Sequence, residues 1–209
     1  MNGYRYDVFL SFKSDSVFNE WIDDHFLPIF SAYLTQDVRV ACKRAYAGLF
    51  YSPRTLEAGD PWPQDLKLAI LQSRVAIALC SPEYFYSKWC LSEFHSFWDR
   101  AKTTQRDLLV PVKIYDGEGF PTEVTGGLQF KDFGEFVIIG EAFKSTPKYV
   151  RFQEELKRFS VLVARRISQA PDYSAWPFVE KAPSPEPPVE QRTLEPPTGP
   201  DSSGPTSAE

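Results

Sequence analysis

The sequence VAIALCSPEYFYSKWCLSEF, residues 75–94, predicts a buried β-strand that leads into a helix. Residues 75–80 are all apolar, as in a strand that is covered on both faces, and a Ser-Pro pair ends the run. Helical spacing then continues over 83–101, first as one or two turns and then as a longer helix, for which Ser87 is a suitable N-cap. This order of elements is typical of α/β proteins.

Further strands and helices precede this stretch. YDVFLSF, residues 6–12, predicts a first buried strand, and apolar residues at spacings of three and four over 17–34 predict the helix after it. Both VRVAC, 38–42, and GLFYS, 48–52, are compatible with a second strand, and we favour the latter. Asp60 and Pro61 then suit the start of a helix that ends near Ser73.

The same alternation continues downstream. Residues 108–114 predict a fourth strand, residues 136–139 a short fifth strand, and residues 150–167 a final amphipathic helix. Strands that alternate with helices predict a mainly parallel sheet with helices on both faces. In such folds, ligands bind at the carboxyl ends of the strands, where three polar or aromatic loops of this chain should meet.

The chain divides into a globular part, residues 1–170, and a tail, residues 171–209. Ten of the eighteen prolines lie in the tail, which has little apolar surface to bury, so we expect it to be disordered. The tail also holds seven acidic and two basic residues, a difference equal to the whole net charge of -5. The globular part is therefore near neutral, which argues against direct nucleic-acid binding.

Cysteine usage and the apolar segments indicate a cytoplasmic protein. Cys42, Cys80 and Cys90 form no CxxC pair, which fits a reducing compartment. The N-terminus lacks a basic region followed by a long apolar run, and VAIALC is far shorter than the roughly 20 residues that span a bilayer. We therefore expect neither secretion nor membrane insertion.

Several familiar motifs are missing from the sequence. There is no GxxxxGK[ST], and Gly117 and Gly119 are followed by Phe-Pro rather than by a helix start. Cys80 ends the third strand, where a receiver domain would need its phosphoacceptor aspartate. His25 and His95 lie on different predicted helices, and no Cys/His cluster has ligand spacing, so we expect no metal site.

Glu93 is the most informative charged residue of the sequence. It borders the apolar stripe of the predicted helix over 83–101, and no basic residue lies three or four positions away. An ionised carboxylate beside apolar surface is unfavourable unless it is solvated or paired, and strained carboxylates of this kind are frequent in active sites. From periodicity alone, a solvated helix carboxylate is an equally good interpretation.

Two segments resemble the TIR (Toll/interleukin-1 receptor) domain family. YDVFLSF and the polar turn after it are similar to the first conserved box, and residues 55–94 to the second-strand loop, the third strand and the SP…Y…S.WC..E segment. The resemblance covers residues 4–115 and, more loosely, extends to about residue 170. It implies a flavodoxin-like three-layer sandwich with a five-stranded, mainly parallel sheet.

The GDPWP loop, the S.WC..E segment and the pair Asp132-Phe133 most resemble stand-alone bacterial TIR proteins, including those of anti-phage defence. The resemblance implies an enzyme that cleaves the nicotinamide–ribose bond of NAD, with Glu93 as the catalytic residue. The carboxylate would stabilise a ribosyl oxocarbenium ion, and capture by water or by an adenine nitrogen would give ADP-ribose or a cyclic ADP-ribose isomer. NAD is then the substrate, and no cofactor is expected.

Residues of three loops are expected to bind NAD by the same resemblance: Phe12, Lys13, Tyr51, Gly59, Trp62 and Trp89. Lys13 would face the pyrophosphate, although many family members have an arginine soon after the first strand. Gly59 would let its loop approach the ligand, and the two tryptophans would stack on nicotinamide or adenine. A solvated lysine, a plain turn glycine and core aromatic residues are the structural alternatives.

Family members commonly need assembly to complete the active cleft. We therefore expect self-association through TIR–TIR contacts, or activation by a separate effector or trigger protein. Two other functions compete with the NAD enzyme. One is a non-catalytic adaptor that recruits TIR domains through the loop over 53–62, and the other is a hydrolase that cleaves another nucleotide.

Overall fold

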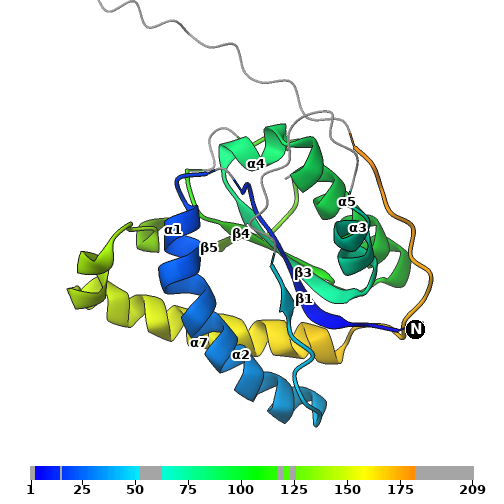
Figure 1. Ribbon diagram of the computed structural model, residues 1–209, viewed down its shortest axis with the longest axis horizontal. Helices are drawn as coiled ribbons and strands as arrows, with labels where there is room; N and C mark the ends of the chain where they lie inside the picture. Colours follow the sequence, from blue (N-terminus) through cyan, green and yellow to red (C-terminus); the bar gives the residue numbers. More distant parts are fainter. Residues whose placement is uncertain (1–2, 15, 52–62, 117–119, 123–125, 182–209) are drawn as a thin grey trace, which may run out of the picture.

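A computed structural model describes residues 3–14, 16–51, 63–116, 120–122 and 126–181 (Figure 1). Its centre is a five-stranded sheet in which all neighbouring strands are parallel. In spatial order the strands are β2 (Leu49–Phe50), β1 (Tyr6–Ser11), β3 (Ser73–Cys80), β4 (Leu109–Lys113) and β5 (Lys131–Asp132). This order confirms the flavodoxin-like α/β fold.

Helices cover both faces of the sheet (Figure 1). Alternate residues of β1 face opposite sides: Val8 and Leu10 join the core of a first helical layer, whereas Phe9 joins the core of a second layer. The first layer contains α1 (Asn19–Trp21), η1 (Ile22–Phe26), α2 (Leu27–Cys42) and α7 (Pro147–Ser168). The second contains α3 (Gln64–Leu71), α4 (Pro82–Tyr86) and α5 (Lys88–Thr104).

The segment after β1 is helical for longer than the apolar spacing predicts. VRVAC, residues 38–42, forms the end of α2, so the favoured strand at 48–52 is the correct one, although β2 is only two residues long. Pro28 lies in the first turn of α2, and the turn just before it, η1, is π-helical. The predicted helix start at Asp60 and Pro61 lies outside the described residues, and α3 is described from Gln64.

The prediction of a fifth strand at residues 136–139 is wrong. β5 is formed by Lys131 and Asp132, which pair with the end of β4. Phe136 instead lies in a 3-10 turn, η2 (Gly134–Phe136), where it packs against Phe133 and Phe152 beneath α7. Phe136 is thus buried by a tight turn rather than by pairing in the sheet, and Ile139, at the end of the apolar run, is 47% exposed. A second 3-10 turn, η3 (Glu141–Ser145), follows.

Residues 171–181, which we call the strap, lie in an extended conformation along α5 (Figure 1). Aromatic side chains fasten it: the ring of Tyr173 meets Tyr4 edge-on at 5.3 Å, and Trp176 lies 5.2 Å from the guanidinium of Arg100. Phe178 packs against the core beneath α3 and α5. The prediction of a disordered tail rested on its prolines and its shortage of apolar residues, and these three aromatic residues are the exception within the strap. Residues 182–209 of the tail lie outside the described part.

Two serines of α5 bind the backbone of the strap. Ser96 Oγ accepts the amide hydrogen of Val179 at 3.0 Å, and Ser92 Oγ accepts that of Lys181 at 2.9 Å. Each hydroxyl donates in turn to the carbonyl four residues earlier in α5. The spacing of the two serines along α5 matches the spacing of the two amides along the strap, because four helical residues rise about 6 Å and two extended residues span about 6.6 Å.

Replacing Phe178 by alanine should lower the free energy of unfolding by about 1–3 kcal/mol, because the ring fills the edge of a core. Thermal or urea unfolding would measure this loss. Val161→Ala is the control, since Val161 is 55% exposed on α7, and it should change stability by no more than about 0.5 kcal/mol. Equal effects of the two changes would show that the strap adds nothing to the fold.

Candidate functional site

Glu93 lies at the carboxyl edge of the sheet, on the inward face of α5. The helix begins after Ser87, whose hydroxyl accepts the amide hydrogen of Cys90, as the N-cap prediction requires. Cys90, Phe94 and Phe97 are all buried on the same helix, and Glu93 is only 7% exposed. A solvated surface carboxylate is therefore excluded.

The Glu93 carboxyl belongs to a short hydrogen-bonded network. Ser11 Oγ, at the end of β1, lies 2.5 Å from Glu93 Oε2 and 2.7 Å from the hydroxyl of Tyr84 on α4. The Tyr84 hydroxyl also lies 3.1 Å from the backbone carbonyl of Cys90. Both Ser11 and Tyr84 are fully buried. The ends of β1 and β3 thus bring three side chains from separate elements to one point.

Sequence reasoning did not single out Ser11 or Tyr84. Ser11 had one signal: it is a polar residue at the end of a strand whose preceding residues, from Val8 to Leu10, are apolar. Tyr84 gave none, because an aromatic residue near a helix start packs into a core as often as it binds a partner. Here it does both, since its ring is buried and its hydroxyl is bonded.

Burial raises the pKa of Glu93 from its ordinary value near 4.5 to about 8, and the hydrogen bond from Ser11 partly opposes this rise. At neutral pH the neutral acid therefore predominates in the empty site. A positive charge placed beside the carboxyl would lower its pKa, because opposite charges favour the ionised form. The site is thus suited to a cationic ligand that ionises Glu93 as it binds.

The other predicted site residues are partly brought together. The ring of Phe12 is buried and stacks on Tyr51 with centroids 5.0 Å apart, and the Cys90 thiol lies 3.5 Å from the Phe12 carbonyl. Lys13, in the loop after β1, and Trp89, in the first turn of α5, are both half-buried. Gly59 and Trp62 lie outside the described residues.

Tyr51 also contacts η1. Its hydroxyl donates a hydrogen bond to the carboxylate of Asp23 in η1. Burial, followed by this hydrogen bond, raises the pKa of Tyr51 above its ordinary range. The phenol is therefore neutral at physiological pH.

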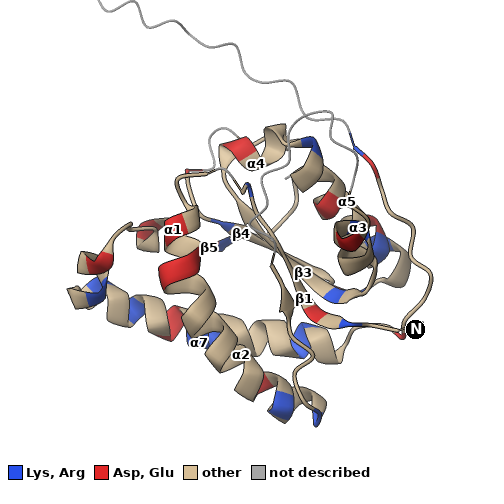
Figure 2. Cartoon of the chain, viewed as in Figure 1, with Lys and Arg blue, Asp and Glu red and all other residues tan. Residues whose placement is uncertain are grey.

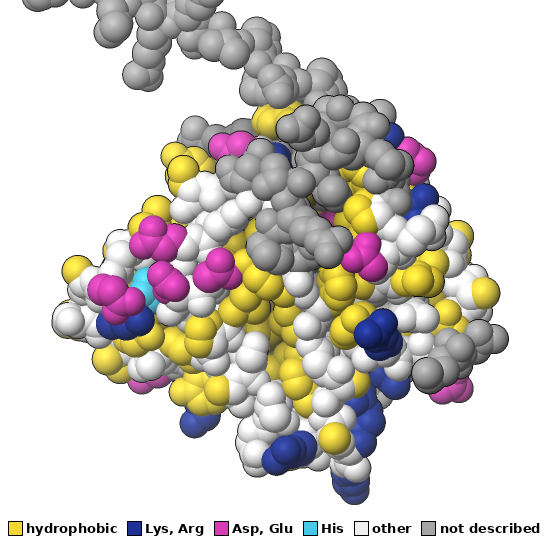
Figure 3. All heavy atoms as spheres, viewed as in Figure 1, with side chains coloured by type: hydrophobic (Ala, Val, Ile, Leu, Met, Phe, Trp, Pro, Cys, Tyr) yellow, Lys and Arg dark blue, Asp and Glu magenta, His cyan; other side chains and the backbone are white. Residues whose placement is uncertain are grey.

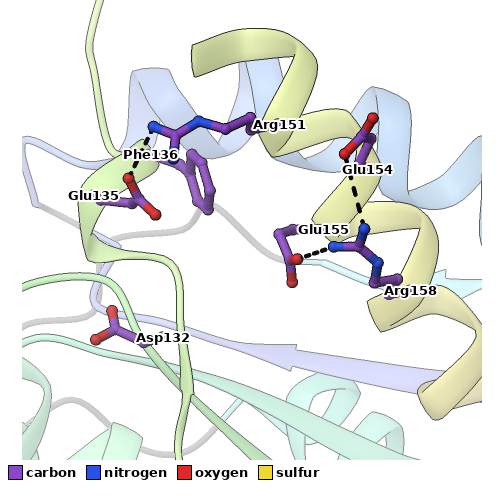
Figure 4. A pocket seen from close by; sticks show the side chains of 7 residues that line it. All are labelled: Asp132, Glu135, Phe136, Arg151, Glu154, Glu155 and Arg158. Atoms are coloured by element: carbon purple, nitrogen blue, oxygen red, sulfur yellow. Dashed lines mark hydrogen bonds and ion pairs between the residues drawn. The ribbon is translucent and has the colours of Figure 1, made fainter.

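A cavity of about 200 Å³ lies elsewhere, between η2 and α7 (Figure 4). Its charged side chains are paired: Arg151 with Glu135 at 3.2 Å, and Arg158 with Glu154 and Glu155. In Figure 4 these pairs line the hollow, and Asp132 lies apart from them below. The remaining charged side chain of the lining, Asp132, pairs with Lys113 at 2.6 Å, so every charged side chain of the lining has an oppositely charged partner.

Charged side chains are unevenly spread over the surface. Acidic side chains gather at the end formed by α1 and η3, and lysine and arginine side chains gather near the end of α2, at the amino edge of the sheet (Figures 2 and 3). Within the described ranges no three His, Cys, Asp or Glu side chains are grouped as metal ligands. None of the described helices is both long and apolar enough to cross a bilayer.

Known proteins resemble this chain over most of its length. Protein SUPPRESSOR OF npr1-1, CONSTITUTIVE 1 of Arabidopsis thaliana is 26% identical over 173 residues, which are 83% of this chain and 10% of that protein. The chain thus spans about a tenth of the length of this relative. The TIR domains of the activated Roq1 resistosome, which directly recognizes the pathogen effector XopQ, align with 24% identity and a TM-score of 0.40, over 74% of this chain and 83% of that one.

The family comparison covers the site itself. The sequence model of the TIR domain matches residues 8–141, a range that contains Ser11, Tyr84 and Glu93 and every strand of the sheet except the first two residues of β1. The matched range is more than half of the chain. The chain belongs to the TIR domain family.

Proposed function

We propose that this TIR domain cleaves the bond between nicotinamide and ribose in NAD, with Glu93 as the catalytic residue. The observation that carries the proposal is the burial of Glu93, 7% exposed, at the edge where parallel α/β sheets bind their ligands. TIR domains include enzymes of this kind. A buried carboxyl with a raised pKa is also more frequent at catalytic sites than elsewhere.

The chemistry makes few demands on the protein. The bond between the ribose anomeric carbon and the nicotinamide nitrogen breaks, and its electron pair neutralises the positive charge of that nitrogen. The ribosyl oxocarbenium ion that remains is stabilised by the Glu93 carboxylate. Attack by water then gives ADP-ribose and a proton, and attack by an adenine nitrogen of the same molecule gives a cyclic isomer.

The cationic substrate would convert Glu93 to its active form. The nicotinamide ring of NAD is positively charged, so its approach favours the ionised carboxyl. In the transition state this charge moves onto the ribose, close to the carboxylate. Glu93 would then be charged mainly when NAD is bound, which keeps an isolated charge out of the buried, empty site.

The other residues that the family resemblance assigns to NAD binding would hold the rest of the substrate. Lys13, next to the end of β1, would contact the pyrophosphate, and Trp89 with Trp62 would stack on the rings of NAD. Phe12 and Tyr51 stack on each other and would form one wall of the cleft. Gly59 would let its loop approach the ligand.

The biological role is part of the same proposal. The product would act as a signal in anti-phage immunity, made in the cytoplasm by a protein that self-associates through TIR–TIR contacts or responds to a separate trigger. Loss of NAD from infected cells that carry the gene, with protection from phage, would support this role. Equal phage growth with and without the gene would contradict it.

Glu93→Ala should abolish NAD cleavage by the purified protein, because it removes the group that stabilises the oxocarbenium ion. Nicotinamide release, followed by chromatography and mass spectrometry at high protein concentration, would measure activity and identify the second product. Glu83→Ala is the matched control, since Glu83 is an exposed glutamate on α4, and it should retain wild-type activity. Absence of cleavage in the assembled wild-type protein would instead favour a non-catalytic adaptor.

The rate of cleavage should rise with pH as Glu93 ionises. In kcat/KM, which reports the free enzyme, the rise should have its midpoint at a pH of about 8. In kcat the midpoint should be lower, because the bound cation favours the carboxylate. Initial rates at low and saturating NAD would give both profiles, and a kcat/KM that is flat between about pH 6 and 9 would contradict the assignment.

A further inference from the structure

The network around Glu93 contains more contacts than its protons can satisfy in the ionised state. Three contacts join four groups: Glu93 to Ser11 at 2.5 Å, Ser11 to Tyr84 at 2.7 Å, and Tyr84 to the Cys90 carbonyl at 3.1 Å. A serine and a tyrosine hydroxyl each supply one proton, and a carbonyl supplies none. Two protons are therefore available for three contacts unless Glu93 supplies the third.

A protonated Glu93 supplies the proton that the third contact needs. The acid donates to Ser11, Ser11 donates to Tyr84, and Tyr84 donates to the Cys90 carbonyl, so every contact holds one proton. When Glu93 loses its proton, the Ser11 hydroxyl must turn to donate to the carboxylate. Tyr84 then donates either to Ser11 or to Cys90, and one contact in either case is left without a proton.

We propose that Ser11 and Tyr84 are positioning residues that set the charge of Glu93, through a hydrogen-bond chain that is complete when Glu93 is neutral and lacks one bond when the carboxylate forms. This inference rests on the proposed function, because it explains how the catalytic residue is kept neutral until substrate arrives. Tyr84 favours the neutral acid, since the neutral state has the additional hydrogen bond. Ser11 favours the carboxylate, since a hydroxyl bonds more strongly to an ionised oxygen than to a neutral acid.

The other titratable groups near the network are two thiols and two lysines. β1 contributes Ser11, α4 contributes Tyr84, and the thiols nearby are Cys80 of β3 and Cys90 of α5. Burial raises the pKa of Cys80 and of Tyr84 well above their ordinary values, so neither carries charge near neutral pH. Lys13 and Lys88 are the nearest basic residues along the chain, on the loop after β1 and in the first turn of α5.

The two hydroxyls should therefore act in opposite directions. Tyr84→Phe should lower the titration midpoint of Glu93 by about one pH unit, the equivalent of one hydrogen bond, and Ser11→Ala should raise it. Carbon-13 NMR of the glutamate carboxyls of the full chain would measure the midpoint, with the Glu93 resonance identified by its loss in Glu93→Gln. Tyr115→Phe, at a tyrosine that is 53% exposed, is the control and should leave the midpoint unchanged.

The pH profile of NAD cleavage gives a second readout. The midpoint in kcat/KM should shift with the NMR midpoint. At about pH 7, Tyr84→Phe should therefore retain a larger fraction of its own maximal kcat/KM than the wild type retains of its maximum. A purely structural role would instead lower the rate equally at every pH. If Ser11→Ala fails to fold, as judged by its melting transition, Tyr84→Phe alone decides the outcome.

Each result separates the inference from the function on which it rests. Opposite shifts of the NMR midpoint without NAD cleavage would support the hydrogen-bond chain and contradict the proposed function. Cleavage that depends on Glu93, with midpoints that do not move or move in the same direction, would support the function and overturn the chain. Opposite shifts in both readouts would support the two together.

Discussion

The burial of β3 on both faces is the constraint on which the rest of this structure depends. Six consecutive residues, Val75 to Cys80, are at most 1% exposed, so apolar layers must cover the strand from both sides. Parallel neighbours of β3 require crossover connections, and here helices make them. The loops that lead into these helices all begin at the carboxyl edge of the sheet. The candidate site thus lies there because the core is built in this way.

The same constraint explains which parts of the fold were predictable. The centres of strands β1, β3 and β4 are apolar because both faces of each strand are buried there. Helix α7 shows a clear helical period because only one of its faces is buried. The edge strands β2 and β5 have two residues each and carry little pattern. Apolar residues near Phe136 therefore looked like a strand, although they pack beneath α7 within and beside a tight turn.

Glu93 was predictable from the sequence, whereas its partners were not. Helical spacing placed the carboxyl beside an apolar stripe, and the family resemblance gave it a role. The contacts of Ser11 with Glu93 and with Tyr84 join positions 82 and 73 residues apart along the chain, and they depend on the register between β1, α4 and α5. Periodicity within one element carries no information about such a register.

The strap changes where the domain ends in space. α7 finishes near the N-terminus, at the amino edge of the sheet, and the strap then runs along α5 in the opposite direction to that helix (Figure 1). Its last described residue, Lys181, binds Ser92, the neighbour of Glu93 in the chain. Any segment joined after this point starts on the same side of the domain as the buried carboxyl. The chain consequently leaves the described part of the domain beside the site instead of behind it, held there by aromatic rings and two serine hydroxyls.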